Sequence, residues 1–346
     1  MSERVLGARA LNRALLARQL LLERATLPLP RAVERIGGIQ AQYAPSAYVG
    51  QWSRLADLDR AALTRALARR SVIQGTLLRG TIHIVSRADY WPIAEAIRPH
   101  VRAWWLRAAR RTGDTARMAR IVPRVRAALA DGPRRRADVI AELGLDSTTW
   151  NGVACWVNLV RVPPSGTWDQ RRADLYGLAE DWVGPNGAEA AAGVALLVRR
   201  YLGGFGPATR KDIQSFTGLP ASALEPALAG VDLRRFRAED GSELLDLPRA
   251  PLPDPDTPAP VRFLGTWDAT LLVHARRTQI LPDPFRGRVF NTKTPHSMPT
   301  FLVDGQVAGS WSYEAGRVLV RPFGALSRVA RRQVDDESER LAAFHR

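Results

Sequence analysis

Three helical patterns followed by a short β-hairpin pattern fill the first part of this chain. Apolar residues recur at helical spacing over 11–22, a proline opens a second helix over 30–38 that a Gly-Gly pair disturbs, and residues 59–70 form a third. The β-rich runs 72–78 and 81–85 flank an Arg-Gly pair, which is a tight-turn signal. Three helices followed by a hairpin are the element order of a winged helix.

The same order of elements recurs further along the chain, although no strict sequence period accompanies it. In the first recurrence, helical patterns at 117–130, 134–143 and 147–160 are followed by strand-like material near Trp168 and at 175–178. In the second, helical patterns at 188–203, 208–217 and 221–229 are followed by a hairpin of 233–236 and 243–247. The repetition is therefore one of architecture, and it predicts further units of the same kind.

Beyond these units the composition changes. Six prolines fall within residues 248–260, which can neither pair in a sheet nor continue a helix and therefore indicate an extended linker. An amphipathic pattern over 326–344 predicts a closing helix. Between them lie β-rich runs that predict a small antiparallel β unit: 270–274, 288–290, 300–303, 306–311 and 317–320.

The formal net charge of +16 restricts the kinds of partner that we expect this chain to bind. A GC-rich genome explains why 48 of the 50 basic residues are arginine, but it leaves the excess over Asp and Glu unexplained. Such an excess is typical of a polyanion-binding surface, and the lack of a basic amphipathic anchor favours nucleic acid over a membrane. No run approaches about 20 apolar residues, and the first ten residues lack a secretory pattern. We therefore expect a cytoplasmic, nucleoid-associated protein.

Cysteine and histidine usage argues against metal and cofactor chemistry. Cys155 is the single cysteine, and its apolar neighbours favour a buried small side chain over a nucleophile. The five histidines show no HxxxH or HxH spacing. We therefore expect neither a metal site nor a cofactor.

Gln40 and Gln42 carry the clearest chemical signal. They follow a Gly-Gly pair at a helix end, and their spacing allows both carboxamides to reach one water molecule. A carboxamide accepts and donates hydrogen bonds but does not ionise, so the pair can orient a nucleophilic water without being a strong base. That chemistry suffices only where the leaving group is already activated. In an arbitrary protein such a pair more often serves surface or capping roles, and Gln51 and Gln74 are nearby alternatives.

Five segments together match a known family. They are LNRALLARQ at 11–19, IQAQY at 39–43, LLRGTIHIVSRADYW at 77–91, GFGPATRKDIQSFTGL at 204–219 and FLVDGQVAGSW at 301–311. On these residues the chain resembles the winged-helix DNA glycosylases related to the azinomycin-resistance enzyme and YcaQ, the AlkZ and YcaQ family. The resemblance spans nearly the whole chain, and the combination is specific although each segment alone is weak.

This resemblance implies both a fold and a pair of catalytic residues. The fold is mainly α with β: winged-helix units at 1–96, 97–184 and 185–250, and then a linker, a small C-terminal β-barrel and a helix within 251–346. The family motif of Gln, an apolar residue and then Gln or Asp falls on Gln40 and Gln42. Because the third position is Gln, the chain is more similar to the azinomycin-resistance branch, AlkZ, than to the YcaQ branch.

The resemblance also implies a substrate, namely bulky N7-alkylguanine adducts and interstrand crosslinks in double-stranded DNA. It further implies that the enzyme gives self-resistance to a DNA-alkylating natural product. Only Lys211, Lys293 and the N-terminus could form a Schiff base, so we expect a monofunctional enzyme without lyase activity. We also expect the protein to be a monomer. Two alternatives stay open, a non-enzymatic winged-helix DNA-binding regulator and a protein that sequesters adducts. Neither of them requires Gln40 and Gln42.

Candidate DNA contacts fall in three places. Arg79 and His83 lie on the first hairpin, where a structural histidine is an equal alternative. Three consecutive arginines at a predicted helix start oppose the helix dipole, which makes an anionic partner more attractive there. A polar loop between two predicted strands could enter a groove or could be an ordinary exposed loop. The three arginines are Arg134, Arg135 and Arg136, and the candidates in the polar loop are Asn291, Lys293 and His296.

Overall fold

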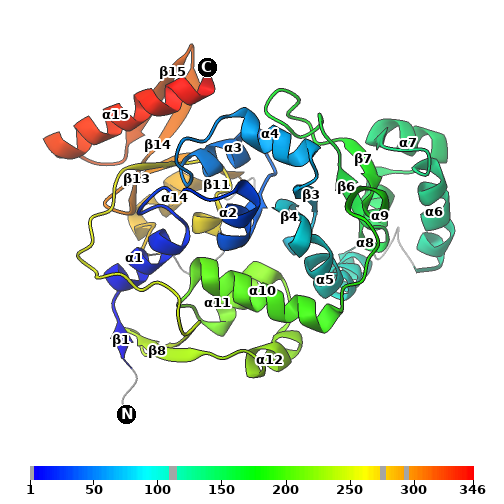
Figure 1. Ribbon diagram of the computed structural model, residues 1–346, viewed down its shortest axis with the longest axis horizontal. Coiled ribbons are helices and arrows are strands. Elements are labelled where there is room, and N and C mark those ends of the chain that lie inside the picture. The colour runs from blue at the N-terminus through cyan, green and yellow to red at the C-terminus, as the bar shows by residue number, and fades with distance from the viewer. Residues whose placement is uncertain (1–3, 109–114, 273–277, 292–295) are drawn as a thin grey trace.

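The computed structural model describes residues 4–108, 115–272, 278–291 and 296–346. Its N-terminal helices lie at the centre, with the C-terminal sheet and the last helix on one side (Figure 1). The second segment, 97–184, which contains α6 (Thr115–Ala128) and α7 (Arg136–Leu143), lies on the other side. The third segment, 185–250, with α10 to α12 within 190–229, lies below. No helix among the described residues is long and apolar enough to cross a membrane.

The first segment, residues 4–96, contains the expected helices and hairpin, together with one helix that the sequence pattern did not predict. The hairpin is confirmed, with a turn in which Arg79 and Gly80 both adopt positive φ. The unpredicted helix is α3, whose residues are all buried, so it has no polar face and no amphipathic period to detect. The elements are α1 Ala8–Arg18, α2 Leu29–Arg35, α3 Ala44–Trp52, α4 Ala61–Ala68, β3 Val72–Thr76 and β4 Ile82–Ser86.

One six-stranded sheet joins the first two segments in the order β2-β4-β3-β6-β7-β5. The helix expected over 147–160 ends at Trp156, and its last residues belong to β6 instead. Trp168 lies in the loop between β6 and β7, not in a strand. The remaining elements are β2 Ile39–Gln40, α5 Arg87–Ala108, α6 Thr115–Ala128, β5 Arg134–Arg135, α7 Arg136–Leu143, α8 Ser147–Trp156, β6 Leu159–Arg161, β7 Leu175–Leu178 and α9 Ala179–Val183.

The third segment follows the predicted order closely. Its three helices precede an antiparallel hairpin, and the short N-terminal strand β1 pairs with that hairpin in parallel. The hairpin of this segment is thereby tied to the start of the chain. The elements are β1 Val5–Leu6, α10 Ala190–Phe205, α11 Arg210–Thr217, α12 Ala221–Ala229, β8 Arg234–Ala238 and β9 Glu243–Asp246.

The C-terminal segment corrects the expectation of a barrel. Within the described residues its four main strands form an open antiparallel sheet, β10-β13-β14-β15, whose outer strands do not pair with each other. Residues 270–272 and 288–289 are helical where β structure was predicted, because β-rich composition alone does not set the backbone. The rest of the first predicted run, 273–274, lies outside the described residues. The elements are β10 Arg262–Leu264, α13 Ala269–Leu272, a 3₁₀ turn η2 Asp283–Phe285, α14 Arg286–Val289, β11 Phe290–Asn291, β12 His296–Ser297, β13 Thr300–Val303, β14 Gln306–Glu314, β15 Arg317–Pro322 and α15 Arg328–His345.

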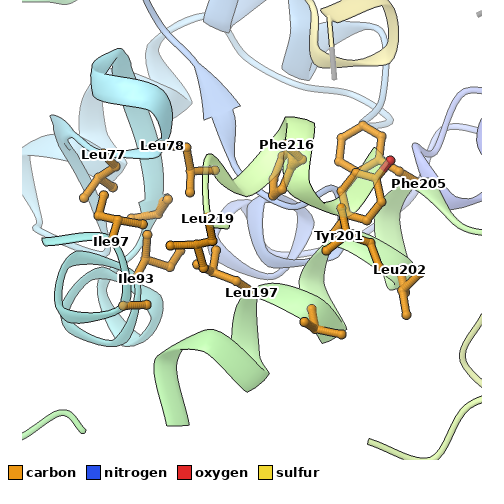
Figure 2. Close-up of a cluster of buried hydrophobic side chains, with 14 of the residues drawn as sticks. Leu77, Leu78, Ile93, Ile97, Leu197, Tyr201, Leu202, Phe205, Phe216 and Leu219 are labelled. Atoms are coloured by element: carbon orange, nitrogen blue, oxygen red, sulfur yellow. The ribbon is translucent and has the colours of Figure 1, made fainter. Parts of the chain in front are cut away.

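Apolar packing connects the first hairpin to the third segment. Figure 2 shows Leu77 and Leu78 beside the hairpin turn, facing Ile93 and Ile97 of α5, with α10 and α11 continuing the same cluster. Phe216 of α11 belongs to this cluster and is 2% exposed. The position of the hairpin turn is therefore fixed from the side of the third segment.

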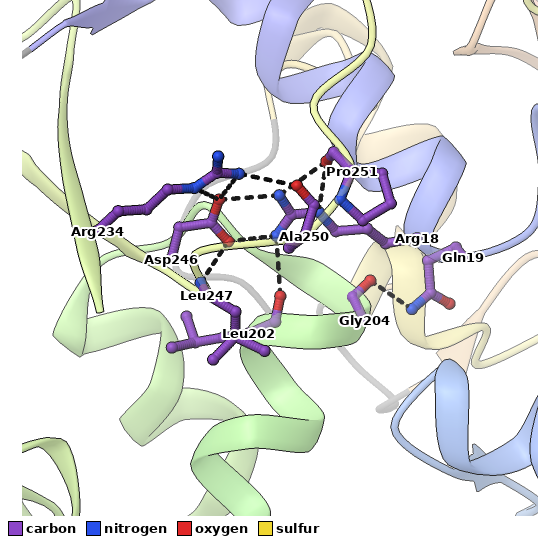
Figure 3. Close-up of polar contacts among 9 residues, drawn as sticks. All are labelled: Arg18, Gln19, Leu202, Gly204, Arg234, Asp246, Leu247, Ala250 and Pro251. Carbon is purple, nitrogen blue, oxygen red and sulfur yellow. Dashed lines mark hydrogen bonds and ion pairs between the residues drawn. The ribbon is translucent and has the colours of Figure 1, made fainter. Parts of the chain in front are cut away.

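Buried polar contacts join the first and third segments a second time (Figure 3). Arg18 of α1 binds Asp246 of β9 through two hydrogen bonds of 2.6 and 3.0 Å, and both side chains are fully buried. Arg234 binds the same carboxylate at 2.7 Å. Gln19 donates to the carbonyl of Gly204 at 2.8 Å. Removing one partner of such a buried pair typically costs about 3 to 5 kcal/mol, so these contacts hold the two segments firmly together.

Candidate active site around Gln40 and Gln42

The local backbone explains how two glutamines come to lie at the end of a short strand. Gly37 and Gly38 have φ of 78° and 89°, values that let the chain leave α2 and turn into β2. A Cβ on Gly37 would also lie 3.1 Å from the ring of Phe205, a tight contact that glycine avoids. Gln40 then pairs in register with His83 of β4, and the ladder continues one residue further through Ala41.

The two glutamine side chains lie on the face of this extended segment that is opposite Ala41. Ala41 is 2% exposed, whereas Gln40 is half-buried and Gln42 is exposed, as strand alternation requires. Arg79 Nη2 donates to Gln40 Oε1 at 3.2 Å, and the backbone N–H of Ile82 donates to Gln42 Oε1 at 3.1 Å. Both of these donors can only donate, so they fix which end of each carboxamide is the oxygen.

Gln42 lies where two cavities meet. The larger cavity, about 990 Å³, is lined by the first hairpin turn, α5, α7 and α8, and we call it the arginine cavity after Arg98, Arg136, Arg161 and Arg172. The smaller one, about 430 Å³, we call the aromatic pocket after Tyr43, Trp168, Trp267, Trp311, Tyr313 and His345. Gln42 lines both of them. A substrate placed against Gln42 therefore has a charged surface on one side and aromatic rings on the other.

Behind Gln40 lies a polar cavity of about 20 Å³, large enough for one water molecule. Arg54 and Asp268 line it and are joined at 2.8 Å, with side chains only 3% and 5% exposed. Burial opposes ionisation of Asp268, but the Arg54 guanidinium and hydrogen bonds lower the pKa of Asp268 overall. Gln51 also lines the cavity and is fully buried, and Gln74 is 1% exposed, so neither is an exposed alternative to Gln40.

Arg79 and His83 occupy different environments on the first hairpin. Besides Gln40, Arg79 donates to the carbonyl of Phe216, so the third segment helps to hold this guanidinium against the site. Although part of Arg79 is exposed, surrounding protein desolvates its guanidinium and lowers the pKa of Arg79 to about 10, which leaves it cationic at neutral pH. His83 is 3% exposed, and burial lowers the pKa of His83 to about 3. Its position favours the structural alternative over DNA contact.

The other predicted DNA contacts are brought together only in part. Arg134 is paired with Glu142 at 2.7 Å and Arg135 with Asp174 at 3.3 Å, whereas Arg136 lines the arginine cavity. Asn291 and His296 are register partners in the β11–β12 hairpin. Lys293, between them, lies outside the described residues.

Sequence reasoning missed Arg161, Arg172 and most of the aromatic pocket. Arg161 left a usable signal, because a charged residue within the apolar run from Leu159 to Val162 is unusual for a strand that is buried on both faces. The pocket rings come from segments far apart in the chain, so no local pattern groups them. Cys155 is buried as expected, and burial raises the pKa of its thiol to about 11. No group of three potential metal ligands occurs within the described ranges.

Comparison with known proteins identifies the family of this chain. A family model described as "DNA glycosylase AlkZ-like" matches residues 33–344. The interstrand DNA cross-link repair glycosylase of Streptomyces sahachiroi is 24% identical to this chain, over a match that covers 94% of this chain and 93% of that protein. The solved structure of Streptomyces sahachiroi DNA glycosylase AlkZ matches with a TM-score of 0.82 at 20% identity, covering 99% of this chain and 97% of that one. Since the family model spans most of the sequence, the chain belongs to the AlkZ-like DNA glycosylase family.

Proposed function

We propose that this DNA glycosylase hydrolyses the N-glycosidic bond of bulky N7-alkylguanine adducts and unhooks interstrand crosslinks, in self-resistance to a DNA-alkylating natural product. The observation that carries the proposal is the pair Gln40 and Gln42. Their carboxamide oxygens are held by Arg79 and by the backbone of Ile82, and Gln42 borders two cavities. The Streptomyces relative named for interstrand cross-link repair supports the crosslink substrate.

The reaction requires little proton transfer from the protein. Alkylation at N7 makes guanine cationic, so when the C1′–N9 bond breaks, its electron pair neutralises the purine. The oxygen of a water molecule bonds to C1′, and the proton that this water loses passes to solvent. The remaining barrier lies in stabilising a positively charged sugar and in delivering that water in the correct direction.

Gln40 and Gln42 are suited to those two tasks. Each fixed oxygen retains a lone pair that can accept from a water molecule, and positioning of a nucleophile can supply several kcal/mol when the geometry is held. The carbonyl dipoles can also stabilise positive charge at C1′. Neither side chain titrates, so an unactivated guanine would remain attached. Specificity for cationic lesions then arises from the chemistry before any pocket contributes.

Lyase activity is not expected from this site. A bifunctional enzyme would need an amine that forms a Schiff base with the sugar aldehyde. Lys211 lies on α11 of the third segment, away from the lining of both cavities that meet at Gln42. The proposed product is therefore an intact abasic site.

The proposal extends to how the enzyme meets DNA. Winged-helix units at 1–96, 97–184 and 185–250 would arrange their surfaces around the duplex, with 251–346 completing the site through Asp268 and the aromatic pocket. A monomer acting on chromosomal DNA in the cytoplasm is sufficient for this chemistry. The net charge of +16 supports binding that depends mainly on phosphate contacts.

The test is incubation of the wild-type chain with duplex DNA containing N7-methylguanine, and separately with an N7-linked crosslinked duplex. We expect free modified base, abasic sites and separated strands on a denaturing gel, and no complex trapped by borohydride. Binding without release of base would support a regulator or a sequestering protein instead.

A further inference from the structure

The arginine cavity contains more positive charge than its own carboxylates neutralise. Four arginines line it, and Asp174 is the single carboxylate among the described lining residues. Asp174 already faces Arg135 at 3.3 Å, and Arg98 is paired with Glu95 on its own helix. Within the described ranges, no carboxylate lies within ion-pair distance of the other three arginines: Arg136, Arg161 and Arg172.

Arg161 is the most unusual of these residues. It is 7% exposed in β6, and its Nε and Nη1 groups have no hydrogen-bond partner in the described part of the chain. Its Nη2 donates to the hydroxyl of Tyr176 at 3.2 Å, and the guanidinium lies 5.0 Å from the centre of that ring. A neutral tyrosine offsets only part of the desolvation of a cation. Burial accordingly lowers the pKa of Arg161.

Arg136 adds a second cation to the lining of the cavity. It is the first residue of α7, and its Nε is buried without a partner among the described residues. Its charge also acts on Arg161 and lowers the pKa of that residue further. A cation at a helix start opposes the helix dipole, whereas an anion placed there is stabilised by both the dipole and the guanidinium.

We infer that the arginine cavity binds a phosphodiester group of the lesion-bearing DNA strand, with Arg161 as its buried contact and Arg136 and Arg172 beside it. Guanidinium groups match phosphate oxygens through charge-assisted hydrogen bonds, and a bound phosphate would satisfy the donors that Arg161 now leaves open. This assignment rests on the proposed function. Because Gln42 lines the same cavity, a phosphate held there sets the register of the strand relative to Gln42.

The test uses binding to undamaged duplex, which requires no base excision. Arg161→Met removes the charge and keeps a long apolar side chain, Arg161→Lys keeps the charge, and Arg332→Met removes an exposed charge on α15, at the far end of the molecule (Figure 1). Affinity is measured by fluorescence anisotropy between about 50 and 200 mM salt, and folding is followed by thermal melting. Single methylphosphonate linkages then scan the strand for the phosphate concerned.

We expect Arg161→Met to melt at or above the wild-type temperature and to lose about tenfold in affinity, with a salt slope smaller by about one. Arg161→Lys should keep the slope with weaker binding, and Arg332→Met should match wild type. One methylphosphonate linkage should weaken duplex binding by wild type but not by Arg161→Met.

Wild-type affinity and salt slope in folded Arg161→Met would overturn the assignment. The assignment would also be overturned if Arg161→Met bound inorganic phosphate more weakly than wild type but bound duplex DNA equally well, since the cavity would then take a free anion. Failure of wild type to release base would refute the proposed function and leave this binding result valid.

Discussion

The arginine cavity and the aromatic pocket share Gln42 and both contain aromatic rings, but they differ in charge. Four arginines line the first, whereas Arg171 is the single side chain in the described lining of the second that is charged at neutral pH, and its Nη1 donates to the hydroxyl of Tyr43 at 3.1 Å. Burial lowers the pKa of His345 in the pocket to about 4, so this ring is neutral as well. We therefore propose a division of work in which ionic contacts hold the DNA strand and the uncharged rings of the aromatic pocket face the lesion.

The largest effect is expected where the two cavities meet. Gln42→Ala and Gln40→Ala should each slow single-turnover excision by about tenfold to a thousandfold, with duplex affinity unchanged, because a positioning group is lost. Gln42→Ala should be the slower variant, since Gln42 is exposed to both cavities. Gln306→Ala, an exposed glutamine on β14, is the matched control and should behave as wild type.

The next effect concerns the charged side of the comparison. Arg172→Met should weaken duplex binding by about tenfold near 100 mM salt and reduce the salt slope by about one. Arg135→Met removes the same charge nearby, but Arg135 is already paired with Asp174, so its slope should change less. Equal losses for the two variants, measured by anisotropy titration, would remove the distinction between paired and unpaired arginines.

A smaller effect, of a different kind, is expected on the aromatic side. Tyr43 is 41% exposed beside Gln42, and Tyr43→Ala should lower affinity for lesion-containing duplex by about fivefold through loss of stacking. The salt slope should stay at the wild-type value because no charge is removed. Tyr43→Phe keeps the ring and loses only the hydrogen bond to Arg171, so it should retain most of the affinity. A reduced slope for Tyr43→Ala would place an ionic contact in the pocket.

The smallest effect is expected from pH. Burial lowers the pKa of His83 to about 3 and that of His345 to about 4, so both are already neutral at pH 6 and stay neutral as pH rises. Gln40 and Gln42 have no titrating proton. Single-turnover excision of N7-methylguanine should therefore change by less than about twofold between pH 6 and 8.5. A bell-shaped profile would assign the chemistry to another residue.

The same histidines give a linked prediction for stability. An unfolded chain binds protons at His83 and His345 below about pH 6.5, whereas the folded chain binds them only near the lowered values. Their contribution to the free energy of unfolding is complete above about pH 6.5 and is lost as pH falls towards 3. Melting temperatures at pH 7 and pH 4.5 would check this direction.

The sequence predicted the parts of the fold that depend on local patterns. The first hairpin, the third segment and the last helix have clear periodicity or turn signals, and all three are confirmed. Helix α3 has no polar face, and the short strand β10 lies next to the proline-rich linker, so both escaped prediction. The shared six-stranded sheet depends on pairing between β3 and β6, which no local signal encodes.

The site residues also divide into those that a local sequence pattern can identify and those that it cannot. Gln40 and Gln42 could be chosen from a short motif in a recognisable context, and their roles stay a prediction. Arg161 stands out in the sequence only as a charged residue within an apolar run, and its significance depends on burial and on the absence of a carboxylate partner among the described residues. Conversely, Arg134 and Arg135 looked equivalent to Arg136 in sequence, but tertiary contacts with Glu142 and Asp174 occupy them. Ion pairing of this kind is set by the three-dimensional fold and not by sequence spacing.

The most direct measurement compares the Gln40→Ala/Gln42→Ala double variant with wild type on one N7-alkylguanine duplex. Excision is followed under single-turnover conditions by free base and abasic sites, and affinity is measured on the same duplex. The account predicts unchanged affinity and folding with excision at least about a hundredfold slower. Wild-type excision by the folded double variant would contradict it, because the two glutamines would then have no part in breaking the glycosidic bond.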